Sequence, residues 1–235
     1  MIPDLETSQK MDINLRNITK EYRLGDRKIL VLDDLNFFCN EKEFIILTGY
    51  SGSGKSTVLS IIGGLTKINK GQARVLNHDL EKMTEEDLAI FRSLYVGFVF
   101  QTGHLLDSLT VLENVLLPVE LAQRNNTDHS YEKIAFKLLE EFKLDNRADS
   151  LPIMLSGGEY QRTVFVRALI LDPDLLLIDE PTSNQDSITT EIIFQKLSEL
   201  KGKKTILVVT HDKHIFPLAD QIYIPTEGKL APYKG

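Results

Sequence analysis

One glycine-rich stretch restricts the possible folds of this chain more than any other feature. It reads GYSGSGKST from residue 49 to residue 57 and fits the pattern G-x-x-x-x-G-K-[ST]. It follows the apolar run 44–47, which predicts a buried strand, and leads into the run 56–62, which predicts a helix. Glycines let the backbone turn so that successive amides point inward, toward phosphate oxygens at the start of the helix. Strand, loop and helix in this order predict a phosphate-binding loop in an α/β protein.

The residues of this loop have separate expected roles in holding ATP and Mg²⁺. Lys55 is expected to contact the β- and γ-phosphates and to act in catalysis, and the Ser56 hydroxyl is expected to coordinate Mg²⁺. An ordinary glycine-rich turn is the alternative, but the Lys-Ser pair and both flanking elements favour a nucleotide site. The expected nucleotide-binding residues of the loop are Gly49, Ser51, Gly52, Ser53, Gly54, Lys55, Ser56 and Thr57.

Two acidic residues follow a second aliphatic run. The run 175–178 leads into Asp179 and Glu180, and Pro181 then blocks further strand pairing. Asp179 is expected to hold Mg²⁺ through water. Glu180, which the period of two places on the other side of the strand, is expected to polarise the attacking water. Taken alone, the pair is equally well explained as solvated acids at a strand end, but the loop upstream favours the catalytic interpretation.

A histidine follows a third apolar run. The run 205–209 predicts a strand that leads into Thr210 and His211. At a strand end, His211 could contact the γ-phosphate or orient the attacking water. Lone histidines after strands are more often surface residues, so the companion motifs are what favour a catalytic role for His211.

The stretch from Ser156 to Glu159 predicts the start of a further helix. Ser156 and Glu159 fit a capping box, in which each side chain bonds the backbone N–H of the other residue. Gly157 and Gly158 leave this helix end bare, and a positively polarised helix end can bind an anion. The loop at 49–57 already surrounds the phosphates from its own side. Ser156, Gly157, Gly158 and Glu159 are therefore expected to contact ATP held by a second subunit.

Together these residues resemble the nucleotide-binding subunit of an ATP-binding cassette (ABC) transporter, from about Asp12 to about Leu230. The resemblance implies an α/β fold: a P-loop NTPase core with a mostly parallel sheet, an antiparallel β edge subdomain and an inserted α-helical subdomain. It also implies ATP hydrolysis by a homodimer that forms upon ATP binding. An integral-membrane permease subunit is the implied partner, which would place the chain at the cytoplasmic face of the inner cell membrane.

The resemblance assigns roles to further residues. Tyr22 resembles the aromatic residue that stacks on adenine, and Gln101 resembles the glutamine that contacts Mg²⁺ and acts in catalysis. Asp186 resembles the aspartate that reaches across the dimer, and His211 resembles the switch histidine. Two alternatives stay open: Tyr22 could be an ordinary strand aromatic, and Gln101 could be a solvated polar residue at a strand end.

The chain is expected to form a single ABC ATPase domain, 1–235. Within it, 1–11 would be a leader, 12–101 and about 157–235 the catalytic core, and about 102–156 the helical subdomain. The expected strands are 13–22, 29–38, 44–47, 71–76, 95–100, 175–179, 205–209 and 221–224; the expected helices are 56–62, 85–92, 111–121, 131–144, 161–170 and 187–200. The inner face of the helix 131–144 is expected to be Tyr131, Ala135, Leu138 and Phe142.

Composition narrows the functional classes. The net charge of −7 disfavours broad nucleic-acid binding, which needs a basic face. No uncharged apolar run approaches the roughly 20 residues that span a bilayer. The single cysteine, Cys39, agrees with a reducing cytosol, and the first ten residues lack the apolar segment of a signal peptide. A soluble ABC protein acting on nucleic acid is therefore the less favoured alternative. A non-hydrolysing regulatory cassette is disfavoured because Glu180 is present.

Several stretches resemble the lipoprotein-releasing and macrolide-exporting branch of the family. They imply a subunit that drives export or release of a lipoprotein or hydrophobic compound. The chain departs from that branch at Tyr50, where Pro is usual, at Tyr160, where Gln is usual, and at Gln185, where Leu is usual. Gln185 and Asp186 also resemble ATPases of phospholipid-trafficking systems, which stay an alternative. The stretches that resemble the branch are 61–65, 96–101, 105–115 and 181–186.

A group of leucines is expected to contact the membrane partner. Leu105, Leu106 and Leu109 lie near Gly103, and they could form a groove that receives a short helix. Internal packing is the alternative for each of these leucines.

Overall fold

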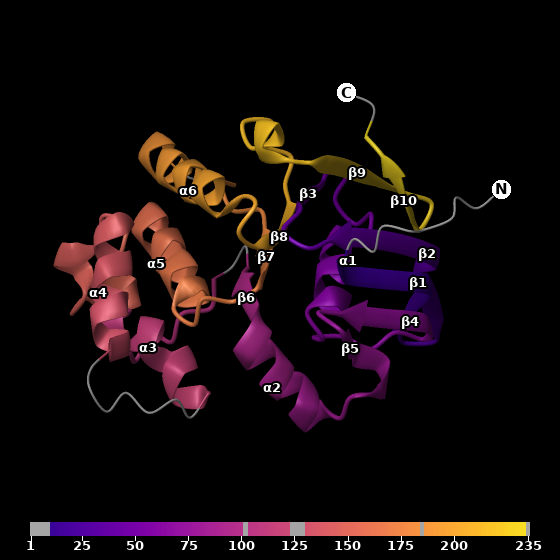
Figure 1. Cartoon of the computed structure of the whole chain (residues 1–235), viewed down its shortest axis with the longest axis horizontal. Coiled ribbons are helices and arrows are strands. Elements are labelled where there is room, and N and C mark those ends of the chain that lie inside the picture. The colour runs from indigo at the N-terminus through magenta and orange to yellow at the C-terminus, as the bar shows by residue number, and fades with distance from the viewer. Residues whose placement is uncertain (1–9, 101–102, 123–129, 184–185, 234–235) are drawn as a thin grey trace.

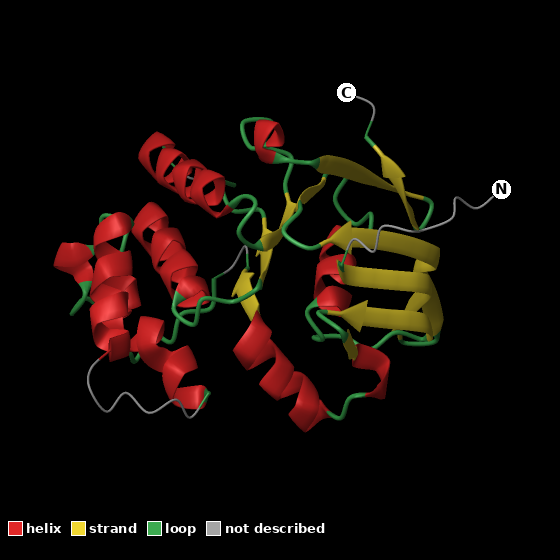
Figure 2. Cartoon of the chain, viewed as in Figure 1, coloured by secondary structure: helices red, strands yellow, loops and turns green. Residues whose placement is uncertain are grey.

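The computed structural model describes residues 10–100, 103–122, 130–183 and 186–233. Figure 1 shows an antiparallel sheet on the right, a second sheet in the middle and a group of helices on the left, and Figure 2 shows the same division by element type. The helices on the left are α3 (Val111–Leu121), α4 (Ser130–Glu141), α5 (Gly157–Leu169) and α6 (Ser187–Leu200).

The central sheet has six strands in the order β10-β9-β3-β8-β7-β6. All neighbouring pairs are parallel except β9 and β10. Leu47 pairs with Val209, and Val209 pairs with Asp179. Because parallel strands end at the same edge of a sheet, the segments after β3, β7 and β8 begin side by side. The strands are β3 (Phe44–Leu47), β6 (Val96–Val99), β7 (Leu175–Asp179), β8 (Thr205–Val209), β9 (Gln221–Thr226) and β10 (Lys229–Pro232).

Strand β3 separates two hydrophobic cores. Side chains alternate between the two faces of a strand. Phe44 and Ile46 accordingly pack into the core that includes α3, α4, α5 and α6. Ile45 and Leu47 pack into the core shared with the antiparallel sheet. All four side chains are fully buried.

The antiparallel sheet has four strands in the order β2-β1-β4-β5. Gly25 adopts a positive φ of 60° in the tight turn between β1 and β2, a conformation that glycine adopts without steric cost. The strands are β1 (Met11–Leu24), β2 (Arg27–Asn40), β4 (Lys70–Val75) and β5 (His78–Asp79). This sheet and the parallel sheet confirm the expected fold class.

Two further helices, α1 (Lys55–Ile62) and α2 (Glu85–Tyr95), pack into the core shared with the antiparallel sheet. Helix α2 begins with the capping box expected at Thr84, and α3 begins with a capping box formed by Thr110 and Glu113. Short 3₁₀ turns cover Leu80–Lys82, Asp145–Arg147, Pro152–Met154 and Phe216–Leu218.

Helix α4 differs from its expectation in length and in its buried face. It ends at Glu141, and Lys143 follows with a left-handed φ of 54°. Ala135 and Leu139 are fully buried, whereas Leu138 and Tyr131 pack only partly against the core. All four expected residues therefore lie against the core, and the structure adds Leu139, the i+4 neighbour of Ala135, which the sequence analysis missed.

The C-terminal end of the chain also differs from its expectation. The strand β9 continues to Thr226, and a further strand, β10, pairs with it. Glu227 and Gly228 both have positive φ values, 51° and 77°, as the two central residues of a tight hairpin turn require. Glutamate is uncommon at such a position, which is why the hairpin was not expected from the sequence.

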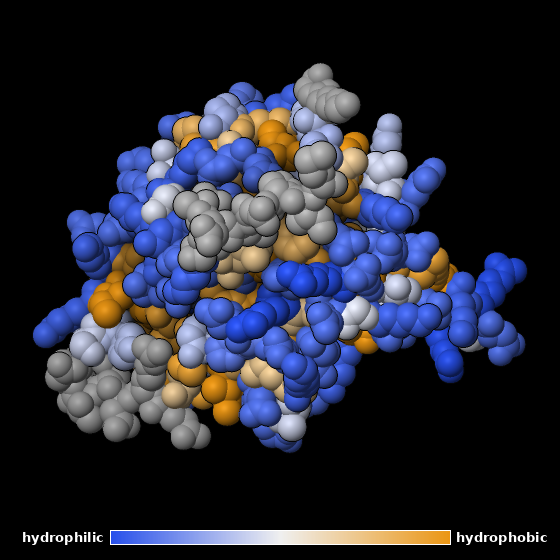
Figure 3. All heavy atoms as spheres, turned by 45° about the vertical axis from the view of Figure 1, so that its right-hand side comes forward, coloured by the Kyte–Doolittle hydropathy of each residue, from blue (hydrophilic) through white to orange (hydrophobic). Residues whose placement is uncertain are grey.

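The surface is hydrophilic over most of the face seen in Figure 3, with apolar areas between the polar ones. In the parts of the chain that the structure describes, no helix has the length and apolar character needed to cross a membrane.

Candidate functional site

The N-terminus of α1 has its first turn left open. Its N-cap residue, Gly54, has a φ of 97° and offers no side-chain cap, and the first turn carries no acidic residue. The hydroxyl of the preceding residue, Ser53, is buried and has no hydrogen-bond partner among the described residues. Helices α2, α3, α5 and α6, by contrast, each have a side-chain cap. The loop therefore presents free donors and a positive helix end, the features that bind phosphate.

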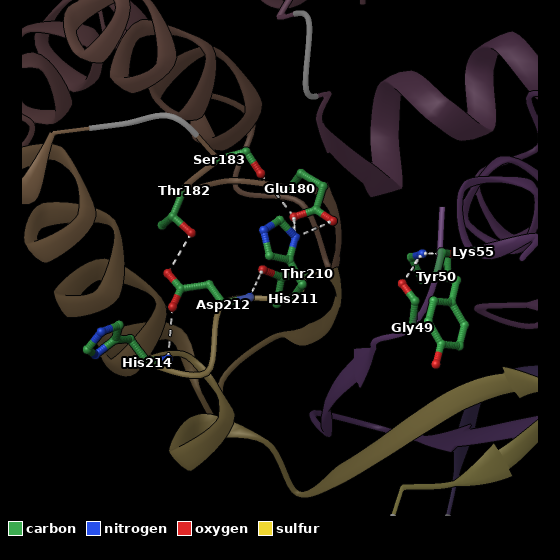
Figure 4. A network of polar contacts seen from close by, with 10 residues as sticks. All are labelled: Gly49, Tyr50, Lys55, Glu180, Thr182, Ser183, Thr210, His211, Asp212 and His214. Carbon is green, nitrogen blue, oxygen red and sulfur yellow. Dashed lines mark hydrogen bonds and ion pairs between the residues drawn. The ribbon is translucent and has the colours of Figure 1, made fainter. Parts of the chain in front are cut away.

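Lys55 lies across this loop. Its Nζ donates hydrogen bonds to the backbone carbonyls of Gly49 and Tyr50, each at 2.7 Å, and the residue is only 8% exposed. Figure 4 shows the ammonium between the two carbonyls. Burial lowers the pKa of Lys55, while the charges of Glu180 and Asp179 raise it. The ammonium therefore lies within electrostatic reach of both acids, and it can exchange carbonyl oxygens for phosphate oxygens.

Asp179, at the end of β7, meets Ser56 from the first turn of α1. Burial raises the pKa of Asp179 above its ordinary value, and a hydrogen bond from Ser56 opposes this shift. Within the described residues, no cluster of three or more His, Cys, Asp or Glu could hold a metal ion. Because Mg²⁺ commonly binds through one carboxylate together with phosphate oxygens and water, the Ser56–Asp179 pair fits a phosphate-bound Mg²⁺.

Glu180 and His211 form a contact between the ends of β7 and β8. His211 Nδ1 lies 3.1 Å from Glu180 Oε1, and Ser183 Oγ donates to Glu180 Oε2 at 3.1 Å. Glu180 has a left-handed φ of 49°. Strand alternation therefore does not set its direction, which corrects the expectation based on a period of two. A non-glycine residue in this conformation needs support from its surroundings, and its N–H donates to the Val209 carbonyl at 2.8 Å.

Asp212 fixes the backbone that follows His211. Its carboxylate accepts hydrogen bonds from Thr182 Oγ1 at 2.8 Å and from the His214 N–H at 2.9 Å. Its own N–H donates to Thr210 Oγ1 at 3.0 Å. Figure 4 shows these residues beside the Glu180–His211 pair. Sequence reasoning missed Thr182, Ser183 and Asp212, since only the adjacency of β7 and β8 brings them together.

The N-terminus of α5 is closed by the expected capping box. The Glu159 N–H donates to Ser156 Oγ at 3.3 Å, and the Ser156 N–H donates to Glu159 Oε2 at 2.8 Å. Arg147 Nε also donates to Glu159 Oε1 at 2.8 Å. The hydrogen bond from the Ser156 backbone is the largest cause of a lowered pKa for Glu159. This end of α5 is therefore less bare than expected, because it carries an ionised carboxylate of its own.

The two glycines of α5 have different surroundings. A Cβ at Gly157 would meet nothing within 4 Å. A Cβ at Gly158 would lie 2.3 Å from Thr189 Oγ1 and 2.4 Å from an Asp186 carboxylate oxygen. Gly157 therefore faces open space, whereas Gly158 allows α5 to pack closely against the start of α6.

Asp186 caps α6 within its own chain. Its carboxylate accepts from the Thr189 N–H at 2.8 Å and from Thr189 Oγ1 at 3.0 Å. The backbone hydrogen bond from Thr189 is the largest cause of the lowered pKa of Asp186, and the charge of Arg162 contributes. Arg162 also donates to Thr189 Oγ1. The expected contact of Asp186 across a dimer stays a prediction.

The structure tests neither of two further residues that were assigned by resemblance. Tyr22 belongs to β1 and is 40% exposed, and the Lys20 ammonium lies 4.8 Å from its ring centroid. Its stacking on adenine stays a prediction. Gln101 lies outside the described residues, as does Gln185.

Comparisons with known proteins show the family of this chain. The ABC transporter family model matches residues 32–183. The lipoprotein-releasing system ATP-binding protein LolD of Treponema denticola is 39% identical over 218 residues, which cover 92% of this chain and 96% of that protein. The macrolide export ATP-binding/permease protein MacB of Chlorobaculum tepidum is 38% identical, and the match covers 92% of this chain but 33% of that protein.

A solved structure of an ATP-binding cassette also matches this chain. The dimeric post-hydrolysis structure of the ATP-binding cassette MJ0796 bound to ADP and Pi has a TM-score of 0.89 with this chain. The two sequences are 36% identical, and the match covers 94% of this chain and 98% of that cassette. The chain belongs to the ABC transporter family, and it is an ATP-binding ATPase subunit close to LolD and to the ATP-binding part of MacB.

Proposed function

We propose that this chain hydrolyses Mg²⁺-bound ATP as one half of a head-to-tail homodimer and thereby drives a separate integral-membrane protein. The observation that carries the proposal is the uncapped N-terminus of α1 within electrostatic reach of Asp179 and Glu180. A phosphate chain supplies the acceptors that this helix end lacks. The dimeric, ADP-bound structure of MJ0796 supports the same arrangement.

The side chains at this edge would have distinct tasks. Lys55 would leave the carbonyls of Gly49 and Tyr50 to bind the β- and γ-phosphates. Ser56 and Asp179 would hold Mg²⁺, with Gln101 proposed on resemblance alone. Mg²⁺, when bound, neutralises charge on the phosphate oxygens.

Glu180 is the proposed residue that polarises the attacking water. His211, at 3.1 Å from its carboxylate, would keep that carboxylate aimed at the water. Ser183 and Asp212 hold the two partners in place through the hydrogen bonds described above.

The opposite half of each nucleotide site would come from a second copy. Gly157 faces open space at the start of α5, with Ser156 beside it. Because Ser156, Gly158 and Glu159 make hydrogen bonds or close contacts within their own chain, we propose that Gly157 and its neighbouring backbone make the direct approach to the γ-phosphate. Tyr22 would stack on the adenine of its own chain's ATP, and Asp186 would lie next to the dimer contact.

The membrane partner would contact the segment that precedes α3. Leu106 is 47% exposed, whereas Leu105 is 6% exposed and belongs to the core. The expected groove therefore cannot include Leu105, for which internal packing is correct. Leu106→Glu should leave basal ATPase activity unchanged and should abolish co-purification with a co-expressed membrane partner. Unchanged co-purification would place the contact elsewhere.

The names of the two relatives support export or release of a lipoprotein or hydrophobic compound as the transport task. Such a task would place the chain at the cytoplasmic face of the inner cell membrane through its partner.

A trapped dimer tests the proposed function. Glu180→Gln keeps the shape of the side chain but removes the base, so we expect ATP to bind and turnover to fall by about 100-fold or more. With Mg²⁺-ATP, size-exclusion chromatography should then show about twice the monomer mass of 26.7 kDa. Glu180→Gln that stays monomeric at saturating ATP would contradict the shared site. Glu191→Gln, on the exposed surface of α6, is the matched control and should turn over ATP without being trapped.

A further inference from the structure

Tyr160 departs from the glutamine that is usual in this branch, and it joins α5 to the segment 103–109. It lies in the first turns of α5, close to Ser156 and Gly157. The Leu105 N–H donates to the Tyr160 hydroxyl at 2.9 Å. Leu105 is buried, so no solvent would replace this acceptor if the hydroxyl were removed.

The same face of α5 holds the start of that segment through two more residues. Gly103 has a φ of 60°, and a Cβ there would lie 2.5 Å from Tyr160 Cε1 and 2.7 Å from Val164 Cγ2. Arg167 donates to the His104 carbonyl at 2.8 Å and to the Gly103 carbonyl at 2.5 Å. Tyr160, Val164 and Arg167 follow the i, i+4, i+7 spacing of one helix face. The segment thus lies directly against α5, with its backbone carbonyls held by a guanidinium.

Helix α3 holds the other half of the segment through Asn114. The fully buried Asn114 amide oxygen accepts from the Leu106 N–H at 2.8 Å. Asn114 Nδ2 lies within hydrogen-bond distance of the carbonyls of Leu106 at 3.1 Å, Leu109 at 3.0 Å and Thr110 at 3.0 Å. The segment is therefore attached on one side to α3 and on the other side to α5, and the exposed Leu106 lies between the two attachments.

We propose that Tyr160 is a positioning residue that makes segment 103–109 and the N-terminal turns of α5 move as one unit. A push on the exposed part of the segment would then displace Ser156 and Gly157 instead of being absorbed by a loose loop. Tyrosine suits this task because its ring has few rotatable bonds and contacts Gly103 while its hydroxyl reaches Leu105. This inference rests on the proposed function, in which the α5 end completes the site of a second copy.

The variant Tyr160→Phe tests the contribution of the hydroxyl separately from that of the ring. The ring still packs against Gly103, but the Leu105 N–H loses its acceptor. Since the Tyr160 hydroxyl bonds segment 103–109, we expect the Kd of a fluorescent ATP analogue and the KM for ATP to stay within about twofold. We expect kcat to fall by about fivefold or more, the lower end of the effect that one unsatisfied buried donor can produce. In the Glu180→Gln background at saturating ATP, the protein concentration for half-maximal dimerisation should rise by a similar factor.

Tyr223→Phe is the matched control. It also removes a phenolic hydroxyl, but that hydroxyl bonds Gln221 of the same strand, β9. It should keep kcat, KM and the dimerisation midpoint of the wild type. All assays should run well below the melting temperature of each variant, so that unfolding does not contribute.

The outcomes are distinguishable. Unchanged kcat in Tyr160→Phe, or equal losses of kcat and ATP affinity in the folded variant, would overturn the positioning role. Failure of the proposed function would be seen separately, as a Glu180→Gln protein with an intact Tyr160 that does not dimerise with ATP. A kcat loss with constant KM, together with a shifted dimerisation midpoint, is the supporting result.

Discussion

Helices α1 and α5 both begin with glycine-rich turns, yet their first turns are completed in different ways. The first turn of α1 has neither a side-chain cap nor an acidic residue. The first turn of α5 has both, in Ser156 and Glu159. Two similar glycine-rich sequences therefore give two different helix N-termini. That of α1 has no anionic group from its own chain, whereas that of α5 already has the carboxylate of Glu159. The difference shows that glycine content alone does not determine how the first turn of a helix is completed.

The largest expected effect comes from removing the lysine at the open end. Lys55→Ala should reduce ATP turnover by about 100-fold or more, because it removes the positive charge that meets the developing phosphate charge. Steady-state phosphate release measures the effect. Lys67→Ala, which loses an exposed ion pair with Glu85, serves as the control. Wild-type turnover in Lys55→Ala would contradict the assignment of the open end.

Mixing variants tests whether the two ends act together across a dimer. Ser156→Arg should inactivate the α5 end by adding bulk and charge. A heterodimer of Lys55→Ala and Ser156→Arg has both lesions in one composite site and leaves the other site intact, so some activity should return on mixing. If proven heterodimers stay inactive, either the sites are not shared or they work only as a pair.

A smaller effect should separate the two glycines of α5. Gly158→Ala forces a methyl group against Thr189 and Asp186, and such overpacking should cost about 1–3 kcal/mol of unfolding free energy. Gly157→Ala adds its methyl group in open space and should not lower stability. Thermal unfolding without nucleotide measures both variants. Equal losses would mean that the close packing of α5 on α6 is not what requires Gly158.

The smallest expected effect concerns Asp179 and has a defined pH dependence. Burial raises the pKa of Asp179 in the folded chain, so its ionisation destabilises the fold as pH rises through that pKa. Asp179→Asn should therefore stabilise the nucleotide-free protein at pH 7 by on the order of 1 kcal/mol, even though it lowers Mg²⁺-dependent turnover. The gain should vanish below about pH 3, where the acid is protonated in the unfolded chain as well. Urea unfolding at both pH values tests this, and a less stable variant at pH 7 would contradict it.

Much of the central sheet could be predicted from local pattern. The strands β3, β7 and β8 and the helices α3 and α6 have the expected bounds, because each is a continuous apolar run or an amphipathic helix with a clear start. The capping boxes at Thr84 and Ser156 were predictable for the same reason: both partners lie four positions apart or closer in the chain.

What could not be predicted depends on contacts between distant segments. The left-handed conformation of Glu180 is supported by its bond to Val209 in the neighbouring strand. Asp212 accepts a hydrogen bond from Thr182, which lies thirty residues earlier in the chain. The bond between Tyr160 and Leu105 likewise joins residues 55 positions apart. In the candidate site, the residues expected to bind or act on ATP could therefore be predicted from the sequence. The residues that hold their side chains and backbone in place could not.

The position of β3 between two cores has a consequence for how the phosphate-binding loop tolerates change. A shift of one residue in strand register would move Phe44 and Ile46 into the core that now holds Ile45 and Leu47. Packing in both cores opposes such a shift. The point at which the phosphate-binding loop leaves the sheet is therefore fixed by contacts on both faces of β3. The amides of β3 pair with β8 and β9, and they should exchange with solvent only when the whole domain unfolds. ATP would thus be anchored beside the slowest-exchanging part of the molecule.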